Sequence, residues 1–144
     1  GQAETINAFG ERIDGVRLRL TELLRGLKAE GKSIAGYGAP TKATTLLMHF
    51  GLGRETLDFT AEDNPLKYGC YIPGALVPIV PSQELYDRSP DYVVVLAWNF
   101  ARPIIEKHAR FHREGGRFIV PMPEPRIIED LDEYLMSTEE EHSR

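Results

Sequence analysis

The sequence predicts one α/β domain with a mainly parallel sheet flanked by helices. Short apolar runs typical of strands alternate with segments in which apolar residues recur at helical spacing. The clearest strand, residues 92–97, is a continuous β-branched run of the kind that is buried on both faces of a parallel sheet. A chain of 144 residues has the length of one ordinary domain and is too short for two separate cores of average size.

A long N-terminal helix over residues 5–30 is predicted from a repeat of apolar residues. Their alternating spacing of three and four places them on one stripe: Ile6, Phe9, Ile13, Val16, Leu20, Leu23 and Leu27. Gly31 follows as a C-cap. Such a stripe is also typical of a coiled coil, but internal glycines weaken a helix by up to about 1 kcal/mol each. Packing against a sheet or a neighbouring domain is therefore favoured.

The next elements follow the order strand, glycine turn, helix. Residues 33–37 predict a buried strand that ends at Gly38, and residues 41–50 predict a helix whose first turn tolerates Pro40. Residues 57–60 predict a second strand. Residues 61–74 contain two glycines and two prolines, which preclude long regular structure.

The second half of the chain continues the alternation. Strands are expected at residues 77–80, 92–97 and 117–120. Helices are expected from about residue 82, at residues 101–113 and at residues 127–135. The acidic residues 137–144 are expected to form a solvated tail.

Charge and composition exclude several classes of function. The net charge is −5, but residues 129–144 hold seven acidic residues against Arg144, so the rest of the chain is nearly neutral. A broad basic surface for nucleic acid is therefore not expected. The longest apolar runs fall well short of the ~18 residues that span a bilayer, so no membrane insertion is expected.

The cysteine content and the first residue suggest the setting of the protein. Cys70 is the single cysteine, which rules out an intramolecular disulfide, and the N-terminus does not resemble a signal peptide. A cytoplasmic location is therefore expected. The chain opens at Gly1 rather than at a methionine, so we interpret it as a fragment of a longer protein.

Ligands of open parallel sheets bind outside the carboxyl ends of the strands, and polar or aromatic residues collect there in this sequence. The groups that follow successive strands are residues 37–40, 62–65, 98–99 and 121–124. In the first group Gly36 and Gly38 permit a tight turn, and the following helix N-terminus and Lys42 suit a phosphate. The third glycine of the dinucleotide fingerprint is absent, so an ordinary turn with a solvated lysine is an equal alternative.

The other groups also carry two interpretations each. Glu62 or Asp63 could accept hydrogen bonds from ribose hydroxyls, or could cap their own turn. Trp98 could stack on a ligand or pack in the core, and Asn99 could contact a ligand or cap the next helix. A functional role is favoured for the loop that carries Lys67, Tyr68 and Tyr71.

The sequence predicts no catalytic residues and no metal site in this chain. His108 and His112 have the spacing of two metal ligands on a helix, but no third ligand is evident, so we interpret them as a pair on a helix surface. Ser82 and Ser89 lack the context of a nucleophile, and Cys70 has no identifiable histidine partner. The domain is expected to hold a ligand rather than to transform it.

Four separated motifs resemble one known family. They are GKSIAGYGAPTKATTLL, EDNPLKYGCYIPG, DYVVVLAWNF and GGRFIVPMPEP, and the resemblance covers about residues 5–128. They resemble the C-terminal domain of sugar-nucleotide C-methyltransferases. The resemblance implies a Rossmann-like domain of a larger enzyme that also has a zinc-binding N-terminal region and a central S-adenosylmethionine-dependent domain. Such enzymes methylate a carbon, typically C3, of a nucleotide-linked deoxy-keto-sugar after a base removes the proton beside the keto group.

The resemblance also implies a substrate site in this chain. Its expected lining residues are Tyr37, Gly38, Ala39, Pro40, Lys42, Asn64, Lys67, Tyr71, Trp98 and Asn99. The expected partners are a nucleotide-linked sugar, with dTDP as its nucleotide, and the methyltransferase domain of the parent chain. S-adenosylmethionine and zinc are expected to bind outside this chain, which alone is expected to be inactive. Cys70 and Tyr68 depart from the basic residue and glutamine that relatives often have.

Two alternatives remain open at this point. The first is a regulatory domain that binds NAD or a similar dinucleotide, against which the missing third glycine argues. The second is an interaction module that uses the apolar stripe of the N-terminal helix.

Overall fold

The computed structural model describes residues 2–39, 47 and 51–142. The elements in chain order are α1 (Gln2–Ala29), β1 (Ile34–Tyr37), β2 (Thr60–Glu62), η1 (Pro65–Lys67), β3 (Tyr71–Ile72), β4 (Val77–Pro81), α3 (Glu84–Asp87), β5 (Tyr92–Val95), η2 (Trp98–Phe100), α4 (Ala101–Lys107), α5 (Ala109–Arg113), β6 (Arg117–Val120), β7 (Arg126–Ile128) and α6 (Leu131–His142). The η segments are short 3₁₀ helices.

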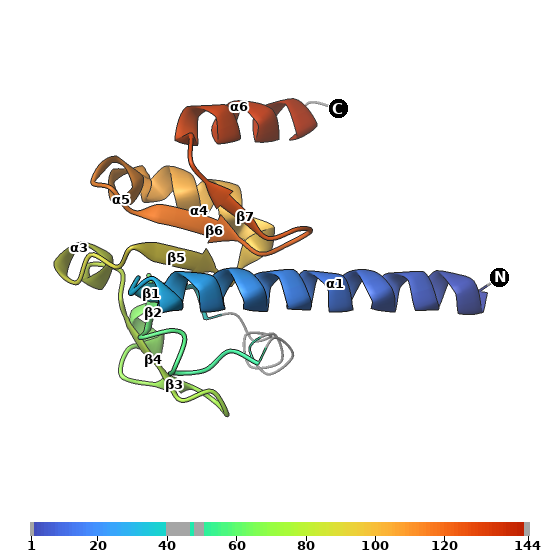
Figure 1. The fold of residues 1–144 in the computed structure, drawn as a ribbon. Coiled ribbons are helices and arrows are strands. Elements are labelled where there is room, and N and C mark those ends of the chain that lie inside the picture. Colours follow the sequence, from blue (N-terminus) through green and yellow to red (C-terminus); the bar gives the residue numbers. More distant parts are fainter. Residues whose placement is uncertain (1, 40–46, 48–50, 143–144) are drawn as a thin grey trace.

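One mixed sheet runs through the described part of the chain (Figure 1). Its strand order is β3-β4-β2-β1-β5-β6-β7. The inner strands β4, β2, β1, β5 and β6 are all parallel, which confirms the expected mainly parallel sheet. The outer strands β3 and β7 are antiparallel to their neighbours and were not predicted from the sequence.

The order of the strands reverses at β1. From β1 the chain moves outward through β2 and β4 on one side of the sheet, and then returns to place β5 and β6 on the other side. A reversal of this kind opens a crevice at the carboxyl ends of the two central strands, here β1 and β5. The fold therefore directs attention to the residues that follow these two strands.

Helix α1 packs on one face of the sheet through Leu20, Leu24 and Leu27, which contact Ile34 and Val94 in one apolar cluster. Leu20 and Leu27 were predicted to lie on this stripe, but Leu24 rather than Leu23 is the buried residue between them. Leu23 is partly buried and packs against the same cluster, because residues three and four positions along a helix lie on the same face.

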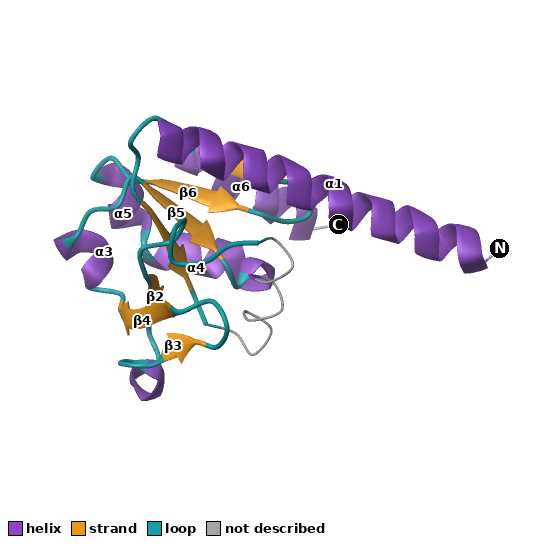
Figure 2. Ribbon diagram, turned by 60° about the horizontal axis from the view of Figure 1, so that its bottom comes forward, coloured by secondary structure: helices purple, strands orange, loops and turns teal. Residues whose placement is uncertain are grey.

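The opposite face of the sheet is covered by helices α3, α4, α5 and α6. Leu85, Ile105, Phe111 and Leu131 come from these four helices and share a second apolar cluster. Figures 1 and 2 show α1 and α4 on opposite sides of the sheet. Strand β5 contributes to both clusters, since Val94 faces α1 while its two neighbours face α4, and this confirms a strand buried on both faces.

Several predicted boundaries are wrong. The second strand is β2, Thr60–Glu62, rather than residues 57–60. The helix predicted over residues 101–113 is divided into α4 and α5 at His108, whose backbone leaves the helical region with φ −110° and ψ 33°. The helix predicted over residues 41–50 lies outside the described residues, apart from Leu47, which is helical and buried.

The C-terminal end also differs from the prediction. Residues 126–128 form β7 rather than the start of a helix, because pairing with β6 buries Ile128. Helix α6 begins only at Leu131 and continues to His142, so most of the expected tail is helical. Among the described residues, no helix is long and apolar enough to cross a membrane.

Candidate functional site

The crevice begins at the turn that follows β1. Gly38 adopts a φ of +97°, a conformation that side chains disfavour, and its N–H donates to Ala61 O at 2.8 Å. The buried Thr60 hydroxyl donates to Gly38 O, also at 2.8 Å. The turn is therefore bonded to β2 through both of the polar backbone groups of Gly38.

Two side chains from the β2 side hold the next residue, Ala39. The Glu62 carboxylate accepts the Ala39 N–H at 2.9 Å, and the Lys67 Nζ donates to Ala39 O at 2.5 Å. The other oxygen of Glu62 accepts the N–H groups of Asp63 and Asn64 at 3.0 and 3.1 Å. Glu62 therefore ties the β1 turn to its own loop through three backbone donors.

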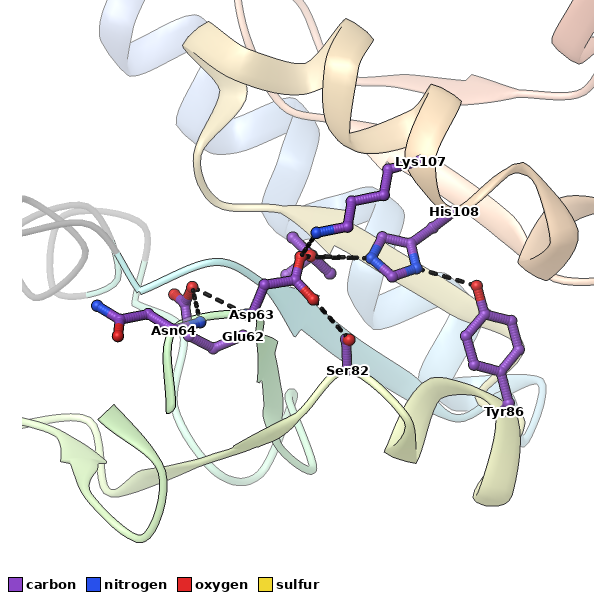
Figure 3. Close-up of polar contacts among 8 residues, drawn as sticks. Glu62, Asp63, Asn64, Ser82, Tyr86, Lys107 and His108 are labelled. Atoms are coloured by element: carbon purple, nitrogen blue, oxygen red, sulfur yellow. Dashed lines mark hydrogen bonds and ion pairs between the residues drawn. The ribbon is translucent and has the colours of Figure 1, made fainter. Parts of the chain in front are cut away.

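Asp63 points the other way, toward α4 (Figure 3). Its carboxylate accepts a hydrogen bond from Tyr37, accepts another from Ser82 at 2.7 Å, and pairs with the Lys107 ammonium at 3.1 Å. Burial acts to raise the pKa of Asp63, but the hydrogen bonds from Tyr37, Ser82 and Lys107 outweigh it and hold the pKa well below its usual value. Burial, followed by the Asp63 carboxylate, raises the pKa of Tyr37 well above its usual value.

His108 completes this network from the opposite side. It is 5% exposed and lies between two phenols, with Nε2 2.9 Å from the Tyr37 hydroxyl and Nδ1 2.9 Å from the Tyr86 hydroxyl. Because Tyr37 donates to Asp63, its oxygen accepts from His108 Nε2–H, which leaves Nδ1 to accept from Tyr86. Burial lowers the pKa of His108 although Asp63 opposes it, which favours the neutral ring. The prediction that His108 lies on a helix surface is wrong.

The other wall of the crevice follows β5. Trp98 is half-buried, whereas Asn99 and Phe100 are exposed. Asn99 does not cap α4, because Phe100 occupies the N-cap position without a side-chain cap bond. The segment that carries Trp98 and Asn99 begins beside the β1 turn, since Leu96 N donates to Tyr37 O at 2.9 Å.

The structure brings some of the predicted lining residues together. Gly38, Ala39 and Lys67 are directly bonded or consecutive, and Asn64 joins them through Glu62. Asn64 also caps η1, because its Oδ1 accepts from Leu66 N at 3.1 Å.

Other predicted residues lie elsewhere. Tyr37 is 3% exposed, and its phenol enters the network rather than the solvent. Tyr71 lies on β3, three strands away from β1 in the sheet. Pro40 and Lys42 lie outside the described residues.

Sequence reasoning missed the contributions of Ser82, Tyr86, Lys107 and His108. Ser82 follows β4, so the rule that selected the ends of the other strands would also have selected it. His108 recurs at helical spacing with Ile104, Ile105 and Phe111, and a histidine on such an apolar face needs polar partners there. No sequence pattern marked Tyr86 or Lys107, because their contacts with His108 and Asp63 depend on how α3 and α4 pack.

The described residues do not fit a metal or a ribose-bound cofactor. They contain no group of three metal-binding side chains, and Cys70 is exposed. Of the two acids that could accept from a ribose after β2, Glu62 already accepts three backbone N–H groups, and Asp63 is bonded to Tyr37, Ser82 and Lys107. We therefore derive no chemical step through zinc, NAD or S-adenosylmethionine in this chain.

The fold defines a Rossmann-like domain, since the five parallel strands follow the order of that class. Comparison with known proteins identifies the family. The profile described as the C-methyltransferase C-terminal domain matches residues 1–123, and the chain belongs to this family. It is 45% identical over 120 residues to the C-methyltransferase NovU of Streptomyces niveus. That match covers 83% of this chain and 29% of NovU.

Proposed function

We propose that this chain is the nucleotide-sugar-binding domain of an S-adenosylmethionine-dependent C-methyltransferase. The observation that carries the proposal is the β1 turn at the reversal of the sheet, where Glu62 and Lys67 hold Ala39 from both of its polar groups. A turn fixed in this way is a rigid surface against which a ligand can pack without an ordering cost, because its own N–H and C=O groups are already bonded within the protein. Because the chain spans less than a third of NovU, the methyl donor and the catalytic base are assigned to the remainder of the parent enzyme.

The residues of the crevice suit the parts of a nucleotide-linked sugar. The pyrophosphate would lie at the start of the segment after Ala39, where Lys42 supplies a positive charge. Trp98 offers a flat apolar surface for stacking, and the amides of Asn64 and Asn99 can donate to and accept from sugar or base. Holding the nucleotide would place the sugar beside the methyl group, which is catalysis by positioning.

The two alternatives fit less well. NAD would need an acid after β2 with free acceptor capacity, and Glu62 is bonded to three backbone donors. An interaction module built on the stripe of α1 would need exposed apolar residues, yet at its C-terminal end Leu20, Leu24 and Leu27 are buried against the sheet of the same chain, so this part is not available to a partner.

Calorimetric titration of the 144-residue chain with dTDP tests the proposal. We expect binding in the micromolar to millimolar range with dTDP, and no binding with NADH in a parallel fluorescence titration. Binding of NADH without dTDP would favour the regulatory domain instead. Absence of binding by both ligands would count against a nucleotide site in this chain.

Separate substitutions of two lysines test the predicted position of the phosphates. Lys42→Ala should weaken dTDP binding by about tenfold, because a charge-assisted contact to phosphate is worth roughly 1.5 kcal/mol or more. Lys28→Ala is the matched control, since Lys28 lies in the last turn of α1. Calorimetry on both variants measures the difference, and equal effects would remove Lys42 from the site.

A further inference from the structure

The polar network around Asp63 gathers side chains from five separate parts of the fold. Tyr37 ends β1, Asp63 and Ser82 follow β2 and β4, Tyr86 lies on α3, and Lys107 and His108 end α4. Figure 3 shows Ser82, Lys107 and His108 around Asp63, with Tyr86 on the other side of His108. The function proposed above does not use this network, and a polar network whose members are all satisfied makes the structure around it more rigid.

The hydrogen bonds of the network run in one direction. Tyr86 donates to His108, His108 donates to Tyr37, and Tyr37 donates to Asp63. Asp63 also accepts from Ser82 and Lys107, and its Oδ2 lies 3.5 Å from His108 Nε2. His108 is thus the link that determines which way the Tyr37 hydroxyl points, because only a donor at Nε2 leaves that hydroxyl free to donate to Asp63.

Asp63 in turn holds the rim of the crevice. It lies between Glu62, whose side chain is bonded to the β1 turn, and Asn64, whose N–H is bonded to Glu62. The loop is therefore fixed from two sides, by Glu62 toward β1 and by Asp63 toward α4. Lys67 follows within the same short segment and reaches Ala39.

We propose that His108 is a positioning residue for the nucleotide-sugar site, acting through Tyr37 and Asp63 on the loop that carries Asn64 and Lys67. The inference rests on the proposed function for the identity of the ligand. That His108 fixes the loop through Tyr37 and Asp63 is also a statement about the protein without ligand. His108 itself is buried and does not contact the ligand. Its effect on binding therefore passes through the loop.

Substitutions at His108 test this with dTDP as the probe. His108→Leu keeps an apolar volume but removes both hydrogen bonds, and we expect dTDP to bind about tenfold more weakly. His108→Gln retains a donor and an acceptor and should recover binding to within about threefold of the original protein. Tyr86→Phe removes the outer bond alone and should change binding by less than threefold.

Leu24→Ala controls for general destabilisation. Leu24 packs on the α1 face of the sheet, away from the network, and its truncation also lowers the melting temperature. At a temperature where all variants are folded, we expect Leu24→Ala to bind dTDP within twofold of the original protein. An equal loss of binding in Leu24→Ala and His108→Leu would overturn the proposal, as would unchanged binding in His108→Leu.

Two measurements on the free protein separate this proposal from the proposed function. Long-range ¹H–¹⁵N NMR at pH 7 should find the His108 ring protonated at Nε2 alone, and a ring protonated at Nδ1 would overturn the direction of the network. If the original protein does not bind dTDP, the proposed function fails, and hydrogen exchange then decides the structural part. Faster exchange of the Asp63 and Asn64 amides in His108→Leu than in Leu24→Ala supports positioning, whereas equal exchange overturns it.

Discussion

Glu62 and Asp63 are adjacent acids, yet each holds a different neighbour. Glu62 accepts from backbone N–H groups and fixes the β1 turn, whereas Asp63 accepts from side chains and fixes the loop against α4. Sequence reasoning selected both residues because an acid after β2 can bind a ribose. It could not assign the donors of Asp63, because they come from residues that are far away in the sequence, such as Lys107.

The buried histidines predict how stability depends on pH. Burial lowers the pKa of His108 and of His112 below the ordinary value of 6.5, so the folded protein binds fewer protons than the unfolded chain just below that pH. Unfolding then takes up protons, and the free energy of unfolding falls as the pH drops below about 6.5. Urea denaturation at pH 7.5, 6.5 and 5.5 should show this decline, and His108→Gln should reduce its slope. A decline that is unchanged in His108→Gln would assign it to other groups.

Asp63 affects the stability of the protein in a separate and more acidic pH range. Its pKa in the folded state is lower than the ordinary value of 3.8. Its contribution to the free energy of unfolding is therefore complete above pH 3.8 and is lost as the pH falls further. Asp63→Asn should therefore destabilise the protein at pH 7 by about 2 kcal/mol and converge toward the original protein below pH 3.8. Acid titration followed by circular dichroism measures both curves, and parallel curves would contradict the assignment.

Gly36 provides a test of packing between β1 and its neighbours. A Cβ added there would lie 3.0 Å from Leu96 Cδ1 and 3.1 Å from Thr60 Oγ1, which is closer than side chains normally pack. Gly36→Ala should therefore lower the free energy of unfolding by about 1 to 3 kcal/mol. Gly26→Ala is the control, because nothing lies within 4 Å of its added Cβ. In a helix this change should be neutral or stabilising by up to about 1 kcal/mol.

At the scale of elements, α1 offers a comparison between two leucines of one helix. Leu24 is 1% exposed in the core, whereas Leu18 is 57% exposed. Leu24→Ala should lower the free energy of unfolding by about 3 kcal/mol, and Leu18→Ala should change it by less than about 0.5 kcal/mol. Urea denaturation measures both. Similar losses would mean that the exposed part of α1 is covered in solution.

The elements that the sequence predicted best are those whose burial is uniform. Strand β5 is β-branched and buried on both faces, so its pattern could be assigned without tertiary information. The break between α4 and α5 could not be predicted, because it occurs where His108 turns toward Tyr37 and Tyr86. Strand β7 was mistaken for a helix, because a run of three residues has too little periodicity and its pairing with β6 decides its structure.

For the whole molecule, the proposed function separates binding from catalysis. This chain should bind dTDP but should transfer no methyl group from S-adenosylmethionine to a dTDP-4-keto-sugar, because the donor site and base are assigned to the remainder of the parent enzyme. Mass spectrometry of the sugar after prolonged incubation measures this outcome. Methylated product from the purified chain would contradict the division of roles.

The two antiparallel outer strands have a consequence for solubility. Sheets with long open edges recruit further strands and aggregate, whereas β3 has two residues, pairs at Tyr71 with Pro78, and is flanked by Pro73. At the other border β7 has three residues and begins directly after Pro125. Neither border offers a long run of free hydrogen-bonding groups to a second molecule, so self-association by strand addition is disfavoured at both ends of the sheet.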